Sequence, residues 1–313
     1  MSAARRRGAW TPAKRAYLRP ILAIIEELES WWPLTLRQVY YRLVAGQVIE
    51  NRDCAYKKLS RVLTHARLDG LVPWDSIEDR GRRCLESSGW LDAASFVDDE
   101  RSQLLLGYRR DLLARQPYAV EVWIEKDALA QVAHRAALEL CVPVVVARGF
   151  VSVSFLNALH QRIQRNARLG HVATRMLYFG DLDPSGWAML PAMLRTLREE
   201  MHVAQEFEAL RCALTPDQVV AWHLPYSVEA LKVSDSRAAP YRAWLREQGY
   251  DDAMAVELDA VPPADLERLV AQAITASLDT TILDADRRAE RAENLQLAEL
   301  RARAAAALSG EPR

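Results

Sequence analysis

Cysteine is scarce in this chain, and long apolar segments are absent from it. The cysteines are scattered, without a Cys-x-x-Cys pair or a His-rich partner segment. We therefore expect neither a zinc site nor a disulfide framework, but reduced thiols, as in the cytoplasm. No apolar run approaches the roughly 18 residues of a membrane helix, and residues 1–10 lack the apolar core of a signal peptide. The sequence thus predicts a cytoplasmic protein without a membrane partner.

The composition excludes bulk disorder and fibrous repeats. Charged residues form 27% and apolar residues 50% of the 313 positions, a balance typical of folded domains. This length allows roughly two domains. The net charge of −1 hides an asymmetry, because residues 1–85 carry +7 and residues 86–313 carry −8. A basic first quarter and an acidic remainder indicate one part that contacts a polyanion and another that carries carboxylates. Two differently solvated surfaces would give the same pattern.

Three helices and a short β-wing are predicted for residues 1–85, which is the order of a winged helix-turn-helix domain. The apolar spacing predicts these helices at 13–30, 36–46 and 54–69. Thr11 and Thr35 precede the first two and are typical N-caps. Residues 71–83, which end in a charged tip, are predicted to form the wing.

The third predicted helix has a basic face. Lys57 and Lys58 each lie about one turn before Arg61, and leucine and valine cover the opposite side. A basic face on the helix that follows the turn suits contact with phosphates in a DNA major groove. A merely solvated face would show the same spacing. The three residues are candidates for DNA binding.

Strands and helices alternate from residue 117 onward, which predicts a parallel α/β sheet. Strands are expected at 118–124, 142–147, 175–179 and 218–224. Helices are expected at 127–140, from 152 or 154 to about 167, and at 186–200. The fold class is therefore α/β. We assign 86–116 to a helical connector, 117–262 to the sheet domain, and 263–313 to a helical tail that packs on the sheet or on a partner chain.

Acidic residues follow two of the predicted strands, where the functional groups of open parallel sheets gather. Glu125 follows the first strand, and Asp181 and Asp183 follow the third. Three converging carboxylates repel one another unless a divalent cation neutralises them. Hard oxygen ligands suit Mg²⁺, or Mn²⁺, bridging to a phosphate. A turn that only caps the next helix would also explain the Asp-x-Asp spacing.

Two basic residues lie near the same strand ends. Lys126 follows Glu125 directly, and Arg148 comes at the end of the second predicted strand. Both are candidates for contact with a nucleic-acid phosphate. An ordinary surface position explains either residue equally well.

The acids belong to a pattern that resembles the Toprim domain. Residues 123–129 read Trp-Ile-Glu-Lys-Asp-Ala-Leu, and residues 180–186 read Gly-Asp-Leu-Asp-Pro-Ser-Gly. In this form the pattern looks like that of the topoisomerase VI A subunit and its meiotic double-strand-break relatives. The resemblance implies that Glu125, Asp181 and Asp183 are metal ligands.

A later segment of that family resembles residues 256–260, Val-Glu-Leu-Asp-Ala. By this resemblance Glu257 is a fourth candidate ligand. A buried or capping acid would explain Glu257 equally well.

The same family begins with a winged-helix domain that contains Arg-x-x-Tyr-Tyr. The second predicted helix here has Arg37, Tyr40 and Tyr41 in that order. The resemblance implies that Tyr41 is the nucleophile. Arg37, on the same helix face, is a catalytic candidate because it could stabilise either the phenolate or the phosphate. The helical spacing agrees, because Tyr41 lies one turn after Arg37, whereas Tyr40 lies on the apolar side. Packing of both rings in a core is the alternative. The combined motifs span about residues 30–260.

The resemblance implies a Mg²⁺-dependent transesterase that makes staggered double-strand breaks through a 5′-phosphotyrosyl intermediate. In that family each site is built across a homodimer, with the tyrosine of one chain and the acids of the other. The chain is shorter than the usual topoisomerase subunit and looks like compact, stand-alone relatives found on mobile elements. Its expected partners are double-stranded DNA in the nucleoid, a second copy, and a separate ATPase subunit that this chain does not encode.

Two other functions are consistent with the sequence. The first is a Toprim nuclease that cuts with metal-activated water, as in the nuclease subunit of Wadjet-type plasmid defence, with a structural Tyr41. The second is a winged-helix DNA-binding protein whose Toprim domain is inactive.

Overall fold

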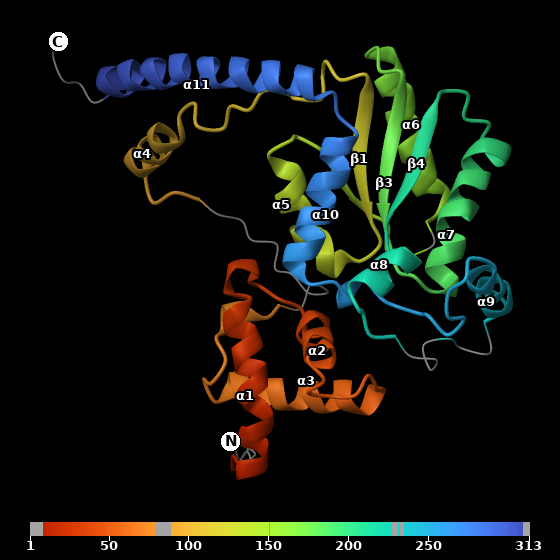
Figure 1. Ribbon diagram of the computed structural model, residues 1–313. Helices are drawn as coiled ribbons and strands as arrows, with labels where there is room; N and C mark the ends of the chain where they lie inside the picture. Colours follow the sequence, from red (N-terminus) through yellow and green to blue (C-terminus); the bar gives the residue numbers. More distant parts are fainter. Residues whose placement is uncertain (1–8, 79–88, 150, 227–230, 232–234, 309–313) are drawn as a thin grey trace.

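A four-stranded parallel sheet is the centre of the larger part of the molecule (Figure 1). This computed structural model describes residues 9–78, 89–149, 151–226, 231 and 235–308. The strands lie in the order β2-β1-β3-β4 and comprise β1 Tyr118–Ile124, β2 Val144–Val146, β3 Ala173–Phe179 and β4 Phe207–Ala213. All strand pairs are parallel. The α/β class and the parallel sheet predicted from the sequence are confirmed.

Helices cover both faces of the sheet, because alternate residues of each strand point to opposite sides. Val122 belongs to one buried cluster, together with residues of α5 and α10. Its neighbour Trp123 belongs to a second cluster, together with residues of α6 and α7. These helices are α5 Ala130–Leu138, α6 Val153–Arg168, α7 Pro184–Arg195 and α10 Pro263–Ala276. The result is a helix–sheet–helix sandwich.

The three predicted N-terminal helices are present, as α1 Pro12–Glu27, α2 Leu36–Ala45 and α3 Asp53–Leu68. Thr11 accepts a hydrogen bond from the backbone N–H of Lys14 and starts α1. Thr35 and Gln38 form a reciprocal capping box that starts α2. Side chains such as Ile21, Leu43 and Leu59 are fully buried between the helices. Local sequence signals therefore define these helices well.

The predicted wing is not formed in the described residues that precede its tip. Trp74–Ser76 form one turn of 3-10 helix, and Leu34 and Ile77 form an isolated parallel bridge. The charged tip was predicted at 78–83, and its residues 79–83 lie outside the described residues. The winged helix as a whole stays a prediction.

Over the described residues 89–116, the connector is helical only in α4 Ala93–Gln103, and residues 104–116 form turns and irregular backbone instead. A side-chain network holds this segment against the last helix, α11 Thr280–Leu308. Arg110 donates hydrogen bonds to Asp286 and to Glu293 of α11. Asp286 is completely buried. The helix expected over residues 104–116 is therefore not formed, and ion pairs with α11 hold this segment instead.

The fourth predicted strand, 218–224, is wrong. The first four of those residues belong to helix α8 Pro216–Ala221. The strand at this edge of the sheet is β4 instead. Thr215 and Gln218 form a capping box with a proline at the first helical turn, which are strong helix-start signals. The apolar spacing of this segment is also compatible with a strand, but the capping box in front of it favours a helix. The next helix, α9 Ala238–Glu247, packs on α7.

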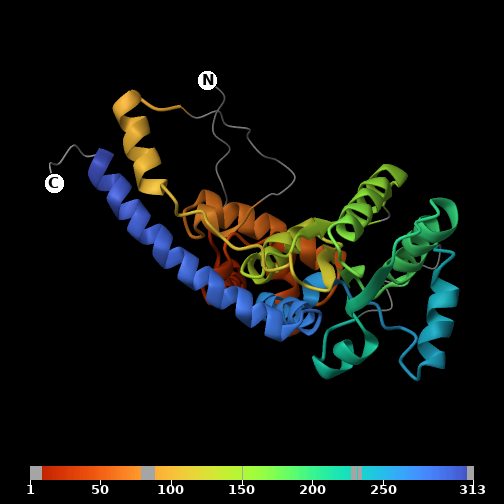
Figure 2. The same ribbon diagram turned by 90° about the horizontal axis from the view of Figure 1, so that it is seen from above.

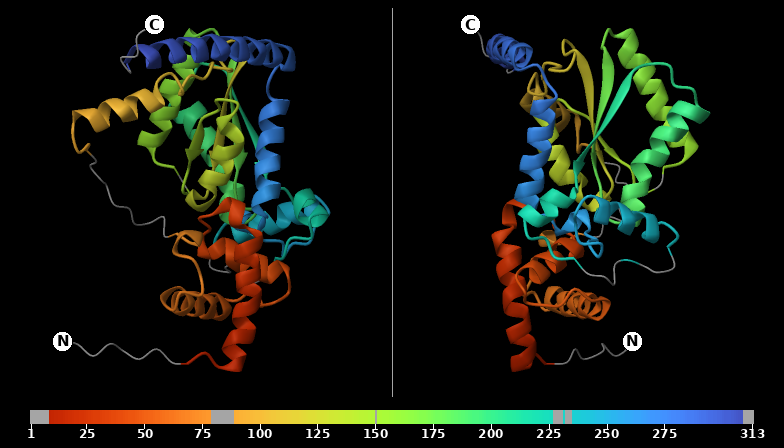
Figure 3. Two further views of the ribbon diagram at one scale, coloured as in Figure 1. Left: turned by 90° about the vertical axis from the view of Figure 1, so that its left-hand side faces the viewer. Right: turned by 45° about the vertical axis from the view of Figure 1, so that its right-hand side comes forward.

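Helices α1–α3 lie below the end of the sheet at which β1 and β3 finish (Figures 1 and 3). At the other end, α11 extends away from the sheet and lies beside α4 (Figures 1 and 2). Within the described residues, no helix has both the length and the apolar character needed to cross a membrane. The arrangement brings the Arg-x-x-Tyr-Tyr helix to the strand ends that carry the acids.

Candidate functional site

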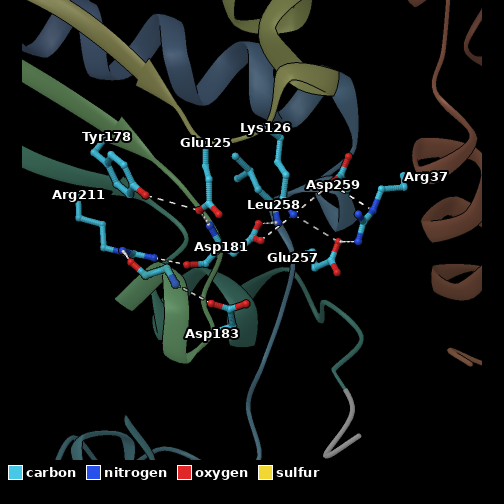
Figure 4. Close-up of polar contacts among 11 residues, drawn as sticks. Arg37, Glu125, Lys126, Tyr178, Asp181, Asp183, Arg211, Glu257, Leu258 and Asp259 are labelled. Atoms are coloured by element: carbon cyan, nitrogen blue, oxygen red, sulfur yellow. Dashed lines mark hydrogen bonds and ion pairs between the residues drawn. The ribbon is translucent and has the colours of Figure 1, made fainter. Parts of the chain in front are cut away.

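The candidate site lies where the carboxyl ends of β1 and β3 meet the segment 256–260 and helix α2 (Figure 4). A pair of backbone hydrogen bonds, each 2.9 Å long, joins Leu182 and Val256 as an antiparallel bridge. The bridge holds Glu257 and Asp259 beside Asp181. Residues remote in the sequence therefore share one polar cluster.

Glu125 lies directly after β1, and its carboxylate faces the loop after β3. Its Oε2 accepts a hydrogen bond from the Asp181 N–H at 3.0 Å and a longer one from the Tyr178 hydroxyl at 3.5 Å. Burial raises the pKa of Glu125, while Lys126 opposes this shift. The side chain thus orders the loop that carries the second acid.

Asp181 is the most enclosed of the predicted acids, with 4% of the residue exposed. Its Oδ1 accepts a hydrogen bond from the Leu258 N–H at 2.8 Å, and its Oδ2 lies 2.8 Å from the Lys126 ammonium nitrogen. Burial and the neighbouring Glu125 raise the pKa of Asp181 to about 7, against the opposing effect of Lys126.

Asp183 caps helix α7, accepting a hydrogen bond from the Gly186 N–H at 2.6 Å. Asp183 therefore has the geometry of a helix cap, which was the alternative explanation of the Asp-x-Asp spacing. Glycine is required on both sides of it. A Cβ at Gly180 would lie 2.8 Å from Glu125 Oε2, and one at Gly186 would overlap the Asp181 carbonyl oxygen.

Two cations face the acids. The Lys126 ammonium nitrogen lies 2.8 Å from Asp181, 3.6 Å from Glu257 and 4.0 Å from Asp259. Arg37 pairs with Glu257, and its Nε lies 3.8 Å from Asp259 Oδ2. Burial opposes both positive charges, but the carboxylates outweigh it and raise the pKa of each cation.

Asp259 is a site residue that sequence reasoning missed. It is 2% exposed, and neither of its carboxylate oxygens accepts a hydrogen bond from the described residues. Burial raises its pKa, and Lys126 and Arg37 oppose that shift. Strand alternation gave no signal for it, because Leu258–Ala260 form a 3-10 turn; only its place two residues after Glu257 pointed to it.

Tyr41 lies within this cluster rather than in a purely apolar core. It is 8% exposed, and its hydroxyl interacts with the Arg37 guanidinium. Burial raises the pKa of Tyr41, Glu257 adds to the shift, and Arg37 opposes it. The Tyr40 hydroxyl instead donates a hydrogen bond to Asn51 at 3.1 Å. The two adjacent tyrosines therefore have different polar surroundings.

Arg211 of β4 contacts the loop between β3 and α7. Sequence reasoning also missed this residue, because it missed the strand that carries it. It donates hydrogen bonds to the carbonyl oxygens of Gly186 and Leu214, each at 3.0 Å, and to that of Asp181. Burial lowers the pKa of this guanidinium. Its contacts hold the backbone around the two predicted aspartates.

The other predicted DNA-binding residues lie outside this cluster. Lys57, Lys58 and Arg61 are exposed on α3. Lys58 packs its ammonium group 4.2 Å from the centre of the Tyr17 ring. Arg148 follows β2 and pairs with Asp127 at 3.0 Å, with most of its side chain exposed.

The donor set suits a hard divalent cation, because it consists of carboxylate oxygens. As the side chains stand, no three His, Cys, Asp or Glu residues among those described are grouped to hold a metal ion. The buried carboxylate of Asp259, which accepts no hydrogen bond from the described residues, nevertheless fits a cation at this position. The chain matches no protein-family model and no curated protein. The resemblance to topoisomerase VI A therefore depends on the sequence motifs alone.

Proposed function

We propose that this chain is a Mg²⁺-dependent DNA-cleaving enzyme of the topoisomerase VI A type. A winged-helix domain would carry Tyr41, and a Toprim domain would carry Glu125 and Asp181. The main support is the contact between α2 and the acids, where Arg37 pairs with Glu257 and Tyr41 follows one turn later. Nucleophile and acids have to meet for this reaction.

In the proposed reaction the Tyr41 oxygen attacks a DNA phosphorus. A tyrosine–phosphate bond forms, the bond from phosphorus to the 3′ oxygen breaks, and the proton lost by the phenol is balanced by one gained by the 3′ oxygen. Burial disfavours the phenolate of Tyr41, so Arg37 would have to stabilise it or the phosphate. Mg²⁺ or Mn²⁺ held by the acids would stabilise charge on the scissile phosphate.

DNA would lie across the exposed basic face of α3, where Arg61 and its neighbours can contact phosphates. Two sites in a homodimer would cut both strands and leave a staggered break. Strand passage would need a separate ATPase subunit, so cleavage alone is proposed for this chain.

A test of the tyrosine mechanism compares Tyr41→Phe with Tyr40→Phe. Supercoiled plasmid is incubated with each protein and Mg²⁺, stopped with denaturant, and analysed with and without proteinase. The wild-type protein and Tyr40→Phe should give linear DNA with protein on its 5′ ends, because the Tyr40 hydroxyl bonds Asn51 instead of facing the acids. Tyr41→Phe should give no linked ends and at least a hundredfold less cutting, on the order of a lost catalytic group. Undiminished cutting by Tyr41→Phe would exclude the mechanism.

A hydrolytic Toprim nuclease is the second candidate, and the burial of the Tyr41 ring favours it. In that case Tyr41→Phe would cut normally and the ends would carry no protein. A purely DNA-binding role would give no cutting by any of the three proteins.

A further inference from the structure

The acid cluster contains one carboxylate without a hydrogen-bond partner. Asp259 is 2% exposed, and both of its oxygens lack a donor among the described residues. An ionised carboxylate buried in this way is costly unless a positive charge lies close to it. The nearest cationic atoms are Arg37 Nε at 3.8 Å and Lys126 Nζ at 4.0 Å, both beyond hydrogen-bond distance. Neither basic side chain therefore gives Asp259 a counter-ion at hydrogen-bond distance.

Lys126 is the cation at the centre of the cluster. Its ammonium nitrogen is within 4.0 Å of three carboxylates, those of Asp181, Glu257 and Asp259. Figure 4 shows the side chain pointing into the acids. A lysine in this position satisfies the acids in place of a metal ion.

The formal charges of the cluster leave an excess of negative charge. When every group is ionised, the carboxylates labelled in Figure 4 outweigh the cations labelled there by two negative charges: the former belong to Glu125, Asp181, Asp183, Glu257 and Asp259, and the latter to Arg37, Lys126 and Arg211. One divalent cation balances that excess. It would also give Asp259 the close positive charge that neither basic side chain supplies.

We propose that a divalent cation enters this cluster by exchange with Lys126, and that Asp259 becomes one of its ligands. The exchange rests on the metal dependence of the proposed function. Once displaced, the ammonium group is free to contact a DNA phosphate, which the sequence predicted for Lys126. Metal binding would then convert an internal counter-ion into a DNA contact.

Mn²⁺ binding to the full-length, chelator-stripped protein tests the exchange without any DNA. The free ion is followed by electron paramagnetic resonance during titration. Lys126→Met should bind Mn²⁺ at least about tenfold more tightly, because the positive charge that competes with the metal ion for the carboxylates has been removed. Asp259→Asn should bind about ten- to a hundredfold more weakly. Lys57→Met on exposed α3 and Asp98→Asn on exposed α4 should bind as the wild type does. Unchanged affinity in Lys126→Met or in Asp259→Asn would overturn the exchange or the ligand role, respectively.

A second measurement uses only the wild-type protein and therefore does not depend on the folding of a variant. Lysine acetylation by a water-soluble reagent is quantified at each site by mass spectrometry. Saturating Mn²⁺ should raise the labelling rate of Lys126 several-fold and leave that of Lys57 unchanged. Equal labelling of Lys126 with and without Mn²⁺ would contradict the displacement. If the protein cleaves DNA but Lys126 does not respond to Mn²⁺, the exchange is excluded and the proposed function stands. If Lys126 responds but no DNA is cleaved, the exchange stands and the proposed function is excluded.

Discussion

At the residue scale, Asp181 links the proposed chemistry to stability. Its carboxylate is buried beside Glu125, and its pKa is raised from 3.8 to about 7. The folded state therefore holds a proton that the unfolded chain has already lost between these two values. As a consequence, the free energy of unfolding falls as pH rises through this window and levels off above it. Carboxylates with raised pKa, such as Glu125 and Asp259, act in the same direction.

Asp181→Asn should remove one part of this pH dependence. Relative to the wild type, the metal-free variant should become more stable as the pH is raised from 5 to 8, by at most about 3 kcal/mol. The measurement is urea unfolding in the presence of chelator at both pH values. Asp98→Asn on α4 is the control and should follow the wild-type curve. Parallel pH curves for Asp181→Asn and the wild type would contradict the shift.

At the scale of elements, the turn between β3 and α7 determines where both aspartates lie. It is compact because Gly186, in the first turn of α7, packs directly on the Asp181 backbone. Arg211 then ties the same carbonyl groups to β4. The turn therefore tolerates little added volume.

Gly186→Ala should destabilise the protein by about 1–3 kcal/mol, since a methyl group would overlap a backbone oxygen that cannot rotate away. Urea unfolding measures the loss. Gly107→Ala is the matched control, because a Cβ there meets no atom within 4 Å. It should change stability by less than about 0.5 kcal/mol. Equal behaviour of the two variants would show that the turn can expand.

At the scale of the whole molecule, the N-terminal helices dock on the sheet domain through Arg37 and Glu257. Tyr41 therefore lies near acids of its own chain. In the family that the sequence resembles, the tyrosine instead acts with the acids of a second chain. The two arrangements differ in what a mixture of inactive chains can do.

A mixture of Tyr41→Phe and Asp181→Ala chains should regain activity if sites form between chains. Each variant alone should cut nothing, whereas a mixed dimer would contain one intact site and nick one strand of a plasmid. About half of the dimers would be mixed if subunits exchange randomly, a mass-action expectation. Gel analysis of nicked and linear plasmid makes the measurement. A mixture that stays inactive despite confirmed subunit exchange would mean that Tyr41 acts with its own chain.

Much of the fold could be predicted because its signals are local. The caps at Thr11 and Thr35 and the apolar spacing that follows define α1 and α2. β1 is predicted to the residue, because an apolar run ends at an acid. β4 was missed because its residues alternate less clearly, and α8 was mistaken for a strand because its cap was overlooked.

The sequence by itself determined helices α1–α3, α5–α7, α10 and α11, three of the four strands, and the placement of Glu125 and Asp181 after strand ends. Those features follow from periodicity and capping, which act over a few residues. Only the tertiary structure decided that Lys126 points into the acids, that Asp259 is buried without a hydrogen-bond partner, and that Arg37 meets Glu257. Arg37 and Glu257 are 220 positions apart. Their meeting depends on how the helices dock on the sheet and on the Leu182–Val256 bridge, which no local pattern encodes.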